Sequence, residues 1–245
     1  MPASYRSLLV AVRASYTPEK AAEEKQAEIL AYLIYRPLSF WLTPPLLRLG
    51  ASADGVTVAM IGLAAAMPVV AAWGGPGAWV GLVAIALLLQ VLDCVDGNIA
   101  RVTQRFSRVG GMLDGLCTLL FWALFFFSAG ILAQQVDGGW VARHGREIGL
   151  ALAALLLAQR EMEDTFDHYV GERVRTEPTL PPAMDFGLRQ GAKAAEHLLA
   201  FGGLALLGAW GRADWFLAGL AVYQVAVFVL WLPRYGRAVW RQRRS

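Results

Sequence analysis

The feature that most limits the fold of this chain is a run of 38 residues, 55–92, without a charged side chain. A spanning helix needs about 20 apolar residues, so this run is long enough to cross a bilayer twice. Gly74, Gly75, Pro76 and Gly77 interrupt it near the middle and predict a tight turn between two helices. With 57% hydrophobic and 17% charged residues, the chain fits a membrane protein and not a soluble, disordered or disulfide-rich one.

Four further segments are candidate spans. Residues 115–136 and 215–233 lack charges over 22 and 19 positions, whereas residues 148–159 and 198–211 do so over only 12 and 14. We retain the shorter pair because six spans place both termini on one side, together with 19 of the 22 Lys and Arg residues. That side is then the cytoplasm. The basic excess reflects topology, and no nucleic-acid partner is predicted.

The first 50 residues differ from the rest. Thr17 before Pro18 predicts a helix start, after which apolar residues such as Ile29 and Leu33 share one face opposite Glu24 and its charged neighbours. This amphipathic helix lies on the membrane surface or packs on the cytoplasmic ends of the spans. The sequence predicts an all-α polytopic membrane protein with a cytoplasmic segment 1–50, a six-helix membrane domain 51–235 and a basic cytoplasmic tail 236–245.

Three carboxylates at the membrane edge call for an explanation, because a charge inside a span costs several kcal/mol. Asp93 and Asp96 share a face at the end of the second predicted span, and Asp114 opens the third. Antiparallel helices joined at this end would bring the three side chains together. Oxygen ligands alone select a hard divalent cation, so we predict a Mg²⁺ or Mn²⁺ site.

Small and basic residues surround these carboxylates. Gly97, Ala100 and Gly110 allow close approach of backbones or leave room for a flat ligand, and Arg101 lies where phosphate oxygens would need partners. A pyrophosphate fits this chemistry. The membrane position suits a substrate with lipid tails in the bilayer and its head group in the cytoplasm.

The segment from Asp93 to Asp114 resembles the motif of the CDP-alcohol phosphotransferases, D-x-x-D-G-x-x-A-R-x8-G-x-x-x-D-x-x-x-D. The seven positions that match are Asp93, Asp96, Gly97, Ala100, Arg101, Gly110 and Asp114. The resemblance extends more weakly to the whole chain, although the family's Pro-Asn-x-x-Thr entry to the first span is here Ala53-Asp54-Gly55-Val56-Thr57.

The resemblance implies transfer of a phosphatidyl or phospho-alcohol group from a CDP-linked lipid, such as CDP-diacylglycerol, to an alcohol, with release of CMP. It implies that Asp93, Asp96 and Asp114 bind Mg²⁺ or Mn²⁺. The positions expected to contact or make room for the nucleotide are Thr57, Asp96, Gly97, Ala100, Arg101 and Gly110. The family resemblance also implies a homodimer, and the small size and short loops indicate a bacterial inner membrane with the site facing the cytoplasm. The acceptor alcohol stays open.

One position departs from the family. Its last aspartate, the expected base for the attacking hydroxyl, is Thr118 here, and a threonine hydroxyl is no base near pH 7. Asp164 and His168, at the cytoplasmic end of the fourth predicted span, are a possible replacement, the alternative being a solvated helix end. His197 with Glu196, at the start of the fifth predicted span, is interpreted as an interfacial pair rather than a ligand.

These sequence features leave three functions to consider. The leading hypothesis is a metal-dependent CDP-alcohol phosphotransferase of phospholipid biosynthesis. The alternative is a catalytically silent relative that binds CDP-lipid or nucleotide as a membrane subunit. A transporter with intramembrane acids is disfavoured, because a proton relay needs no Gly and Ala at this spacing.

Overall fold

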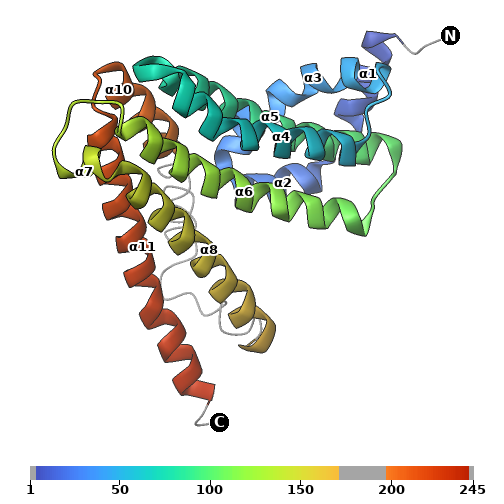
Figure 1. Ribbon diagram of the computed structural model, residues 1–245. Coiled ribbons are helices and arrows are strands. Elements are labelled where there is room, and N and C mark those ends of the chain that lie inside the picture. Colours follow the sequence, from blue (N-terminus) through green and yellow to red (C-terminus); the bar gives the residue numbers. More distant parts are fainter. Residues whose placement is uncertain (1–3, 171–196, 243–245) are drawn as a thin grey trace.

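The first three predicted spans are long apolar helices. The computed structural model describes the backbone of residues 4–170 and 197–242, and every regular element in these ranges is helical. Helices α4 (Ala53–Trp73), α5 (Ala78–Thr103) and α6 (Arg108–Ala133) run side by side in Figure 1. Each is long and apolar enough to cross a membrane. The all-α class is confirmed for the described residues.

A second group of helices diverges from the first, as Figure 1 shows. It contains α8 (Gly145–Val170) and α11 (Ala213–Gln242), which the short helices α7 (Trp140–Arg143) and α10 (Gly203–Ala209) precede along the chain. Within the described ranges, Leu198–Ala209 and Ala213–Val229 are apolar but shorter than a span. Six spans with both ends on one side therefore stay a prediction.

Helix ends in the first group follow from local hydrogen bonds. Ser52 and Ser107 cap α4 and α6, their hydroxyl oxygens accepting from the backbone N–H of Gly55 (3.1 Å) and Gly110 (2.7 Å). The predicted turn after α4 is a 3-10 turn in which Gly75 has φ +61°, a left-handed conformation that favours glycine. Only a short loop separates α5 from α6, so the C-terminal end of one meets the N-terminal end of the other.

Close backbone contact joins the two groups. Helix α6 packs against α4 on one side and α8 on another. At the α6–α8 crossing, a Cβ atom added to Gly130 would lie 2.3 Å from the carbonyl oxygen of Gly145, and one added to Gly149 would lie 2.7 Å from that of Phe126. The two helices can approach this closely only because these positions lack side chains.

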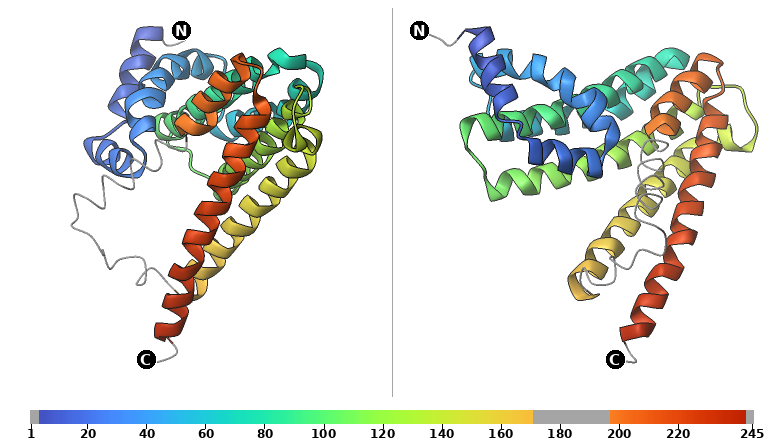
Figure 2. Two further views of the ribbon diagram at one scale, coloured as in Figure 1. Left: turned by 90° about the vertical axis from the view of Figure 1, so that its left-hand side faces the viewer. Right: turned by 180° about the vertical axis from the view of Figure 1, so that it is seen from behind.

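The N-terminal segment is not the single helix that the apolar pattern predicts. Thr17 caps α2 (Pro18–Ala27) as expected, but α2 ends before Glu28, whose backbone is extended. The chain continues through a π-helical turn, η1 (Ala31–Tyr35), into α3 (Arg36–Arg48). Seen from behind in Figure 2, α1 (Tyr5–Ala14), α2 and α3 lie against the α4–α6 group.

The N-terminal segment is expected either to pack on the ends of the spans or to lie on the membrane surface, and its two sides differ in burial. Ser39 and Thr43 of α3 are fully buried, whereas Leu33, Leu38 and Trp41 are each at least half exposed. One side thus packs on the membrane helices. The apolar side chains on the other side are available to a bilayer surface, which remains a prediction.

We expect Gly130→Ala to lower the free energy of unfolding by about 1–3 kcal/mol, because the added methyl group would have to separate two backbones. The matched control is Gly62→Ala in α4, where a Cβ atom meets nothing within 4 Å. Alanine is the better helix former, so this change should be neutral or slightly stabilising. Thermal unfolding in lipid nanodiscs compares the two, and equal melting temperatures would contradict this account of the crossing.

Candidate active site at the α5–α6 turn

The predicted site residues meet at one end of the helix pair. Asp93, Asp96, Gly97, Ala100 and Arg101 lie on the C-terminal part of α5, and Gly110 and Asp114 lie on the first turns of α6. The short loop between the two helices forces these segments together. The motif residues are therefore divided between α5 and α6.

Asp96 is held by a side chain from a third helix. The hydroxyl of Thr57 in α4 donates to Asp96 Oδ2 at 2.7 Å, and it lies 3.2 Å from the carbonyl oxygen of Ala53 one turn earlier. Thr57 is 3% exposed, so its hydroxyl reaches the site only through this carboxylate. Thr57 therefore orients Asp96.

Asp93 and Asp114 are exposed, and the negative charges of Asp96 and Asp114 act on Asp93. Within residues 4–170 and 197–242, neither Asp93 nor Asp114 forms a salt bridge. A divalent cation would compensate such a set of carboxylates, so the donor chemistry fits Mg²⁺ or Mn²⁺. In that same part of the chain, no three His, Cys, Asp or Glu side chains are close enough together to hold an ion.

Gly97 makes room for the guanidinium of Arg101. A Cβ atom at Gly97 would lie 3.3 Å from Arg101 Nη1 and 3.4 Å from Nη2. Arg101 Nη2 donates to Asn98 Oδ1 at 2.8 Å, whereas Arg101 Nε is buried without a hydrogen-bond partner among the described residues. The glycine and the asparagine together fix where this cation lies.

Gly110 makes room for a carboxylate of the neighbouring helix. A Cβ atom at Gly110 would lie 2.6 Å from Asp54 Oδ1. Ser107 Oγ, which caps α6, also lies 3.1 Å from Asp54 Oδ2 and donates to it. Asp54 stands where the family has asparagine, and here it ties the start of α4 to the start of α6.

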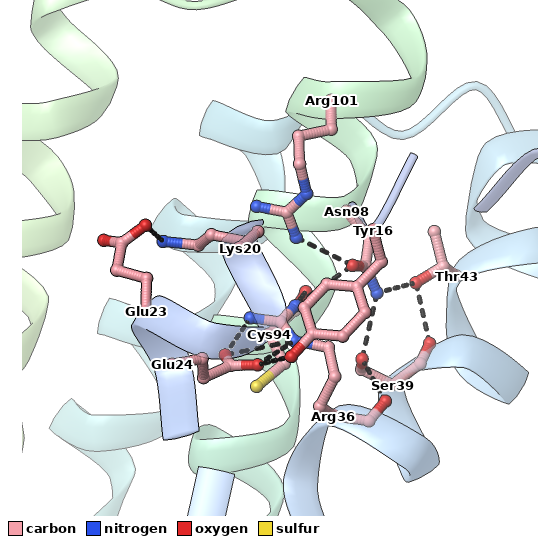
Figure 3. Close-up of polar contacts among 10 residues, drawn as sticks. All are labelled: Tyr16, Lys20, Glu23, Glu24, Arg36, Ser39, Thr43, Cys94, Asn98 and Arg101. Atoms are coloured by element: carbon pink, nitrogen blue, oxygen red, sulfur yellow. Dashed lines mark hydrogen bonds and ion pairs between the residues drawn. The ribbon is translucent and has the colours of Figure 1, made fainter. Parts of the chain in front are cut away.

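Behind the motif, Asn98 is fully buried and uses all of its hydrogen-bonding capacity, as Figure 3 shows. Its amide nitrogen donates to Ser39 Oγ (2.9 Å) and Thr43 Oγ1 (3.1 Å) of α3. Its carbonyl oxygen accepts from Arg36 Nη1 (3.0 Å) as well as from Arg101. One residue thus connects the N-terminal segment to the motif arginine.

Arg36 anchors this network. It is 6% exposed, donates through Nη1 to the Cys94 carbonyl oxygen at 2.7 Å, and forms an ion pair with Glu24 of α2. Burial raises the pKa of Glu24, but hydrogen bonds from Arg36 and Tyr16 outweigh it and hold that pKa below its usual value. The carboxylate therefore stays charged beside the buried guanidinium.

A polar cavity of about 220 Å³ adjoins the motif on the other side of α5. Its lining comes from the N-terminal segment, α4, α5, α6, α8 and the start of η4 (Leu198–Gly202), a second π-helical turn. The residues that line it are Glu28, Met60, Leu89, Gln90, Asp93, Cys117, Thr118, Phe121, Trp122, Arg160 and His197. Asp93 and Thr118, the first and last motif positions, thus face the same space.

The hydroxyl of Thr118 lies within hydrogen-bond distance of its own helix, 3.2 Å from the carbonyl oxygen of Asp114. The proposed replacement residues, Asp164 and His168, belong to the last turns of α8, but their side chains lie outside the described part of the structure. That hypothesis is therefore untested. Glu196, the expected partner of His197, also lies outside the described residues, so that pair is untested. Among the described residues, Glu28 lies beside His197.

Sequence reasoning missed Arg36, Asn98 and the contact between Glu28 and His197. Asn98 carried a local signal, because it is an amide between apolar neighbours on a helix that must be buried on both sides. Arg36 and Glu28 carried none, since both sit in a segment where charged residues are common. Their partners are far away in the sequence.

The described residues form an all-helical protein with three long apolar helices, and three carboxylates lie where α5 and α6 are joined. The family model for CDP-alcohol phosphatidyltransferase matches residues 51–232, and the chain belongs to this family. This match runs from α4 into α11, as far as residue 232, and includes the whole motif. A comparison with curated protein sequences gave no match.

Membership in the family supports an integral membrane enzyme that transfers a phosphatidyl group from a CDP-alcohol to an alcohol acceptor in lipid synthesis. Enzymes of this family generally use divalent metals, which agrees with the donor set of the carboxylates.

We expect Glu24→Gln to lower the free energy of unfolding by about 1.5–3 kcal/mol, because it weakens hydrogen bonds to a buried charge. Since the folded pKa of Glu24 lies below its ordinary 4.5, the contribution is complete above that pH and is lost as the pH falls further. Only the wild-type protein should show this acid-dependent loss. Hydrogen exchange of residues 16–48 between pH 3 and 7 measures it.

Glu23→Gln is the matched control. Glu23 pairs with Lys20 at 3.1 Å, but 68% of its side chain is exposed, so the change should alter stability by less than about 0.5 kcal/mol. Equal protection in the two variants would show that the buried pair does not hold the N-terminal segment on α5.

Proposed function

We propose that this protein transfers the phosphatidyl group of a CDP-linked lipid, CDP-diacylglycerol or a close relative, to an alcohol and releases CMP. The observation that carries the proposal is that Asp93, Asp96, Gly97 and Arg101 near the end of α5 lie at the same end of the helix pair as Asp114 near the start of α6, inside the matched family region. The site would face the cytoplasm, in a bacterial inner membrane. A homodimer and six spans belong to the same proposal.

In this reaction the acceptor hydroxyl attacks the phosphorus that carries the lipid. The bond from that phosphorus to the bridging oxygen breaks, and CMP leaves. Arg101 would hold the nucleotide phosphate, and Gly97, Ala100 and Gly110 would leave room for the nucleotide. The hydroxyl of Thr57 would keep the Asp96 carboxylate oriented toward the site. Thr57 itself would act on the nucleotide only indirectly, through Asp96.

Asp93, Asp96 and Asp114 would hold Mg²⁺ or Mn²⁺. A bound ion would neutralise the diphosphate and the negative charge on the leaving CMP.

An apolar cavity of about 140 Å³ supports a lipid donor. Phe126, Leu199, Leu207 and Phe216 are among its lining residues, and Trp122 lines both this cavity and the polar one. A lipid whose head group reaches the motif could therefore place part of an acyl chain here. Two neighbouring cavities, one polar and one apolar, fit a lipid substrate with a polar head group and an acyl chain.

A silent relative that only binds the donor is the second candidate function, and Thr118 is the observation that favours it. Its hydroxyl cannot accept a proton near pH 7, and it already lies within hydrogen-bond distance of the Asp114 carbonyl oxygen. CMP binding without CMP release would support this candidate.

The test of the leading proposal is CMP release from CDP-diacylglycerol by the protein in nanodiscs, with Mg²⁺ or Mn²⁺ and a mixture of alcohol acceptors. We expect Asp96→Asn to reduce release at least about 100-fold, as the loss of one charge-stabilising group does in other enzymes. Removal of the metal with a chelator should have a similar effect.

Asp137→Asn is the matched control, because Asp137 is exposed in the loop after α6, at the opposite end of that helix from Asp114. It should release CMP at the wild-type rate. A wild-type protein that releases no CMP with any acceptor would refute the proposed transfer.

We expect Gly97→Ala to weaken CMP binding several-fold, because the new methyl group would press on the guanidinium of Arg101. Gly111→Ala is its control, since a Cβ atom at Gly111 meets nothing within 4 Å. Calorimetric titration with CMP in the presence of Mn²⁺ compares the two. Equal affinities would remove Arg101 from the nucleotide site.

A further inference from the structure

We propose that His197, paired with Glu28, takes the proton from the acceptor alcohol in place of the missing motif carboxylate. This inference rests on the proposed function, because the transfer needs a group that accepts the proton of the attacking hydroxyl. In this proposal the acceptor alcohol binds in the polar cavity.

The cavity has the position and size for a small alcohol. Asp93 and Thr118 line it, so it opens onto the carboxylate set on one side. Its volume of about 220 Å³ lies below the 300–1,000 Å³ typical of pockets for drug-sized ligands. The head group of a small acceptor alcohol fits such a space.

Glu28 and His197 approach each other on the wall of this cavity. His197 Nε2 lies 3.5 Å from Glu28 Oε1, and the histidine side chain is only 11% exposed. Glu28 Oε1 is buried and has no hydrogen bond from any described residue. A proton gained by His197 would give this carboxylate a charged partner, so the pair is suited to accept one.

Aromatic rings hold the imidazole in place. The rings of Trp122 and Phe201 lie at centroid distances of 5.9 and 5.4 Å from that of His197, both edge-to-face. Tyr35, at the end of η1, approaches it at 6.2 Å. The histidine therefore has a fixed position at the cavity and does not depend on a mobile surface side chain.

The proton transfer and the phosphatidyl transfer need no reactant beyond the CDP-lipid and the acceptor alcohol. The acceptor O–H bond breaks, its electron pair forms the new P–O bond, and the proton passes to the imidazole of His197. The bond from phosphorus to the bridging oxygen breaks, and CMP leaves with that electron pair. Glu28 neutralises the imidazolium, as a carboxylate does for a catalytic histidine in other enzymes.

Other charged and titratable groups face the same space and will influence its pH dependence. Asp93 comes from α5, Cys117 from α6 and Arg160 from α8, and Tyr35 touches the histidine from η1.

The experiment measures CMP release in nanodiscs, its pH profile, CMP binding and thermal unfolding for four variants. We expect His197→Gln to lower release at least about 100-fold, the usual range for loss of a general base, with CMP binding and melting temperature unchanged. Glu28→Gln should cause a smaller loss. His144→Gln, on the exposed loop beside Trp140, should behave as wild type.

The fourth variant, His197→Gln with Thr118→Asp, places a carboxylate at the motif position. It should restore release to within about tenfold of wild type. Its loss of activity at low pH should also move to more acidic values, because a carboxylate titrates below an imidazole.

Near-wild-type release by His197→Gln would overturn this inference while leaving the proposed transfer intact. So would a parallel loss of CMP binding and thermal stability, since that would indicate a structural role. A wild-type protein that releases no CMP would instead overturn the transfer itself, and this inference with it.

Discussion

A guanidinium buried against a membrane helix must find an opposite charge and enough acceptors, and this requirement at Arg36 organises the N-terminal half of the protein. Glu24 supplies the charge, and the Cys94 carbonyl and Asn98 supply the acceptors. These contacts of Arg36 connect α2 and α3 to α5, as Figure 3 shows. Through Asn98 the same contacts reach Arg101, and through the end of α2 they place Glu28 beside the cavity.

Much of the fold follows from hydropathy and local hydrogen bonds. The three long apolar helices, the glycine turn after Trp73 and the cap at Thr17 could all be predicted, because each depends on neighbouring residues. The placement of Asp96 and Asp114 at the same end of α5 and α6 could be predicted as well, because only a short loop joins the two helices. The break at Glu28 could not, because the same apolar spacing suits one straight helix or two helices joined by a π-helical turn.

The rest of the candidate site depends on long-range pairs. Nothing near Glu28 in the sequence indicates that its partner is His197. That histidine lies far along the chain, just before the predicted fifth span, which is shorter than a spanning helix needs. The motif from Asp93 to Asp114 could be identified because it resembles the motif of the CDP-alcohol phosphotransferases. Glu28 and His197 belong to separate elements with no regular spacing between them, so only the folded structure shows that the two side chains are close.

Both residues of that pair lie next to π-helical turns, η1 and η4. Such a turn accommodates about one residue more than an α-helical turn, and each residue of an α-helix corresponds to a rotation of about 100°. Deleting one residue within Leu198–Gly202 would make the helix regular and swing His197 away from the cavity, although every lining side chain would keep its identity. Insertions and deletions, and not substitutions alone, can therefore decide whether a relative with this motif has an imidazole facing the acceptor.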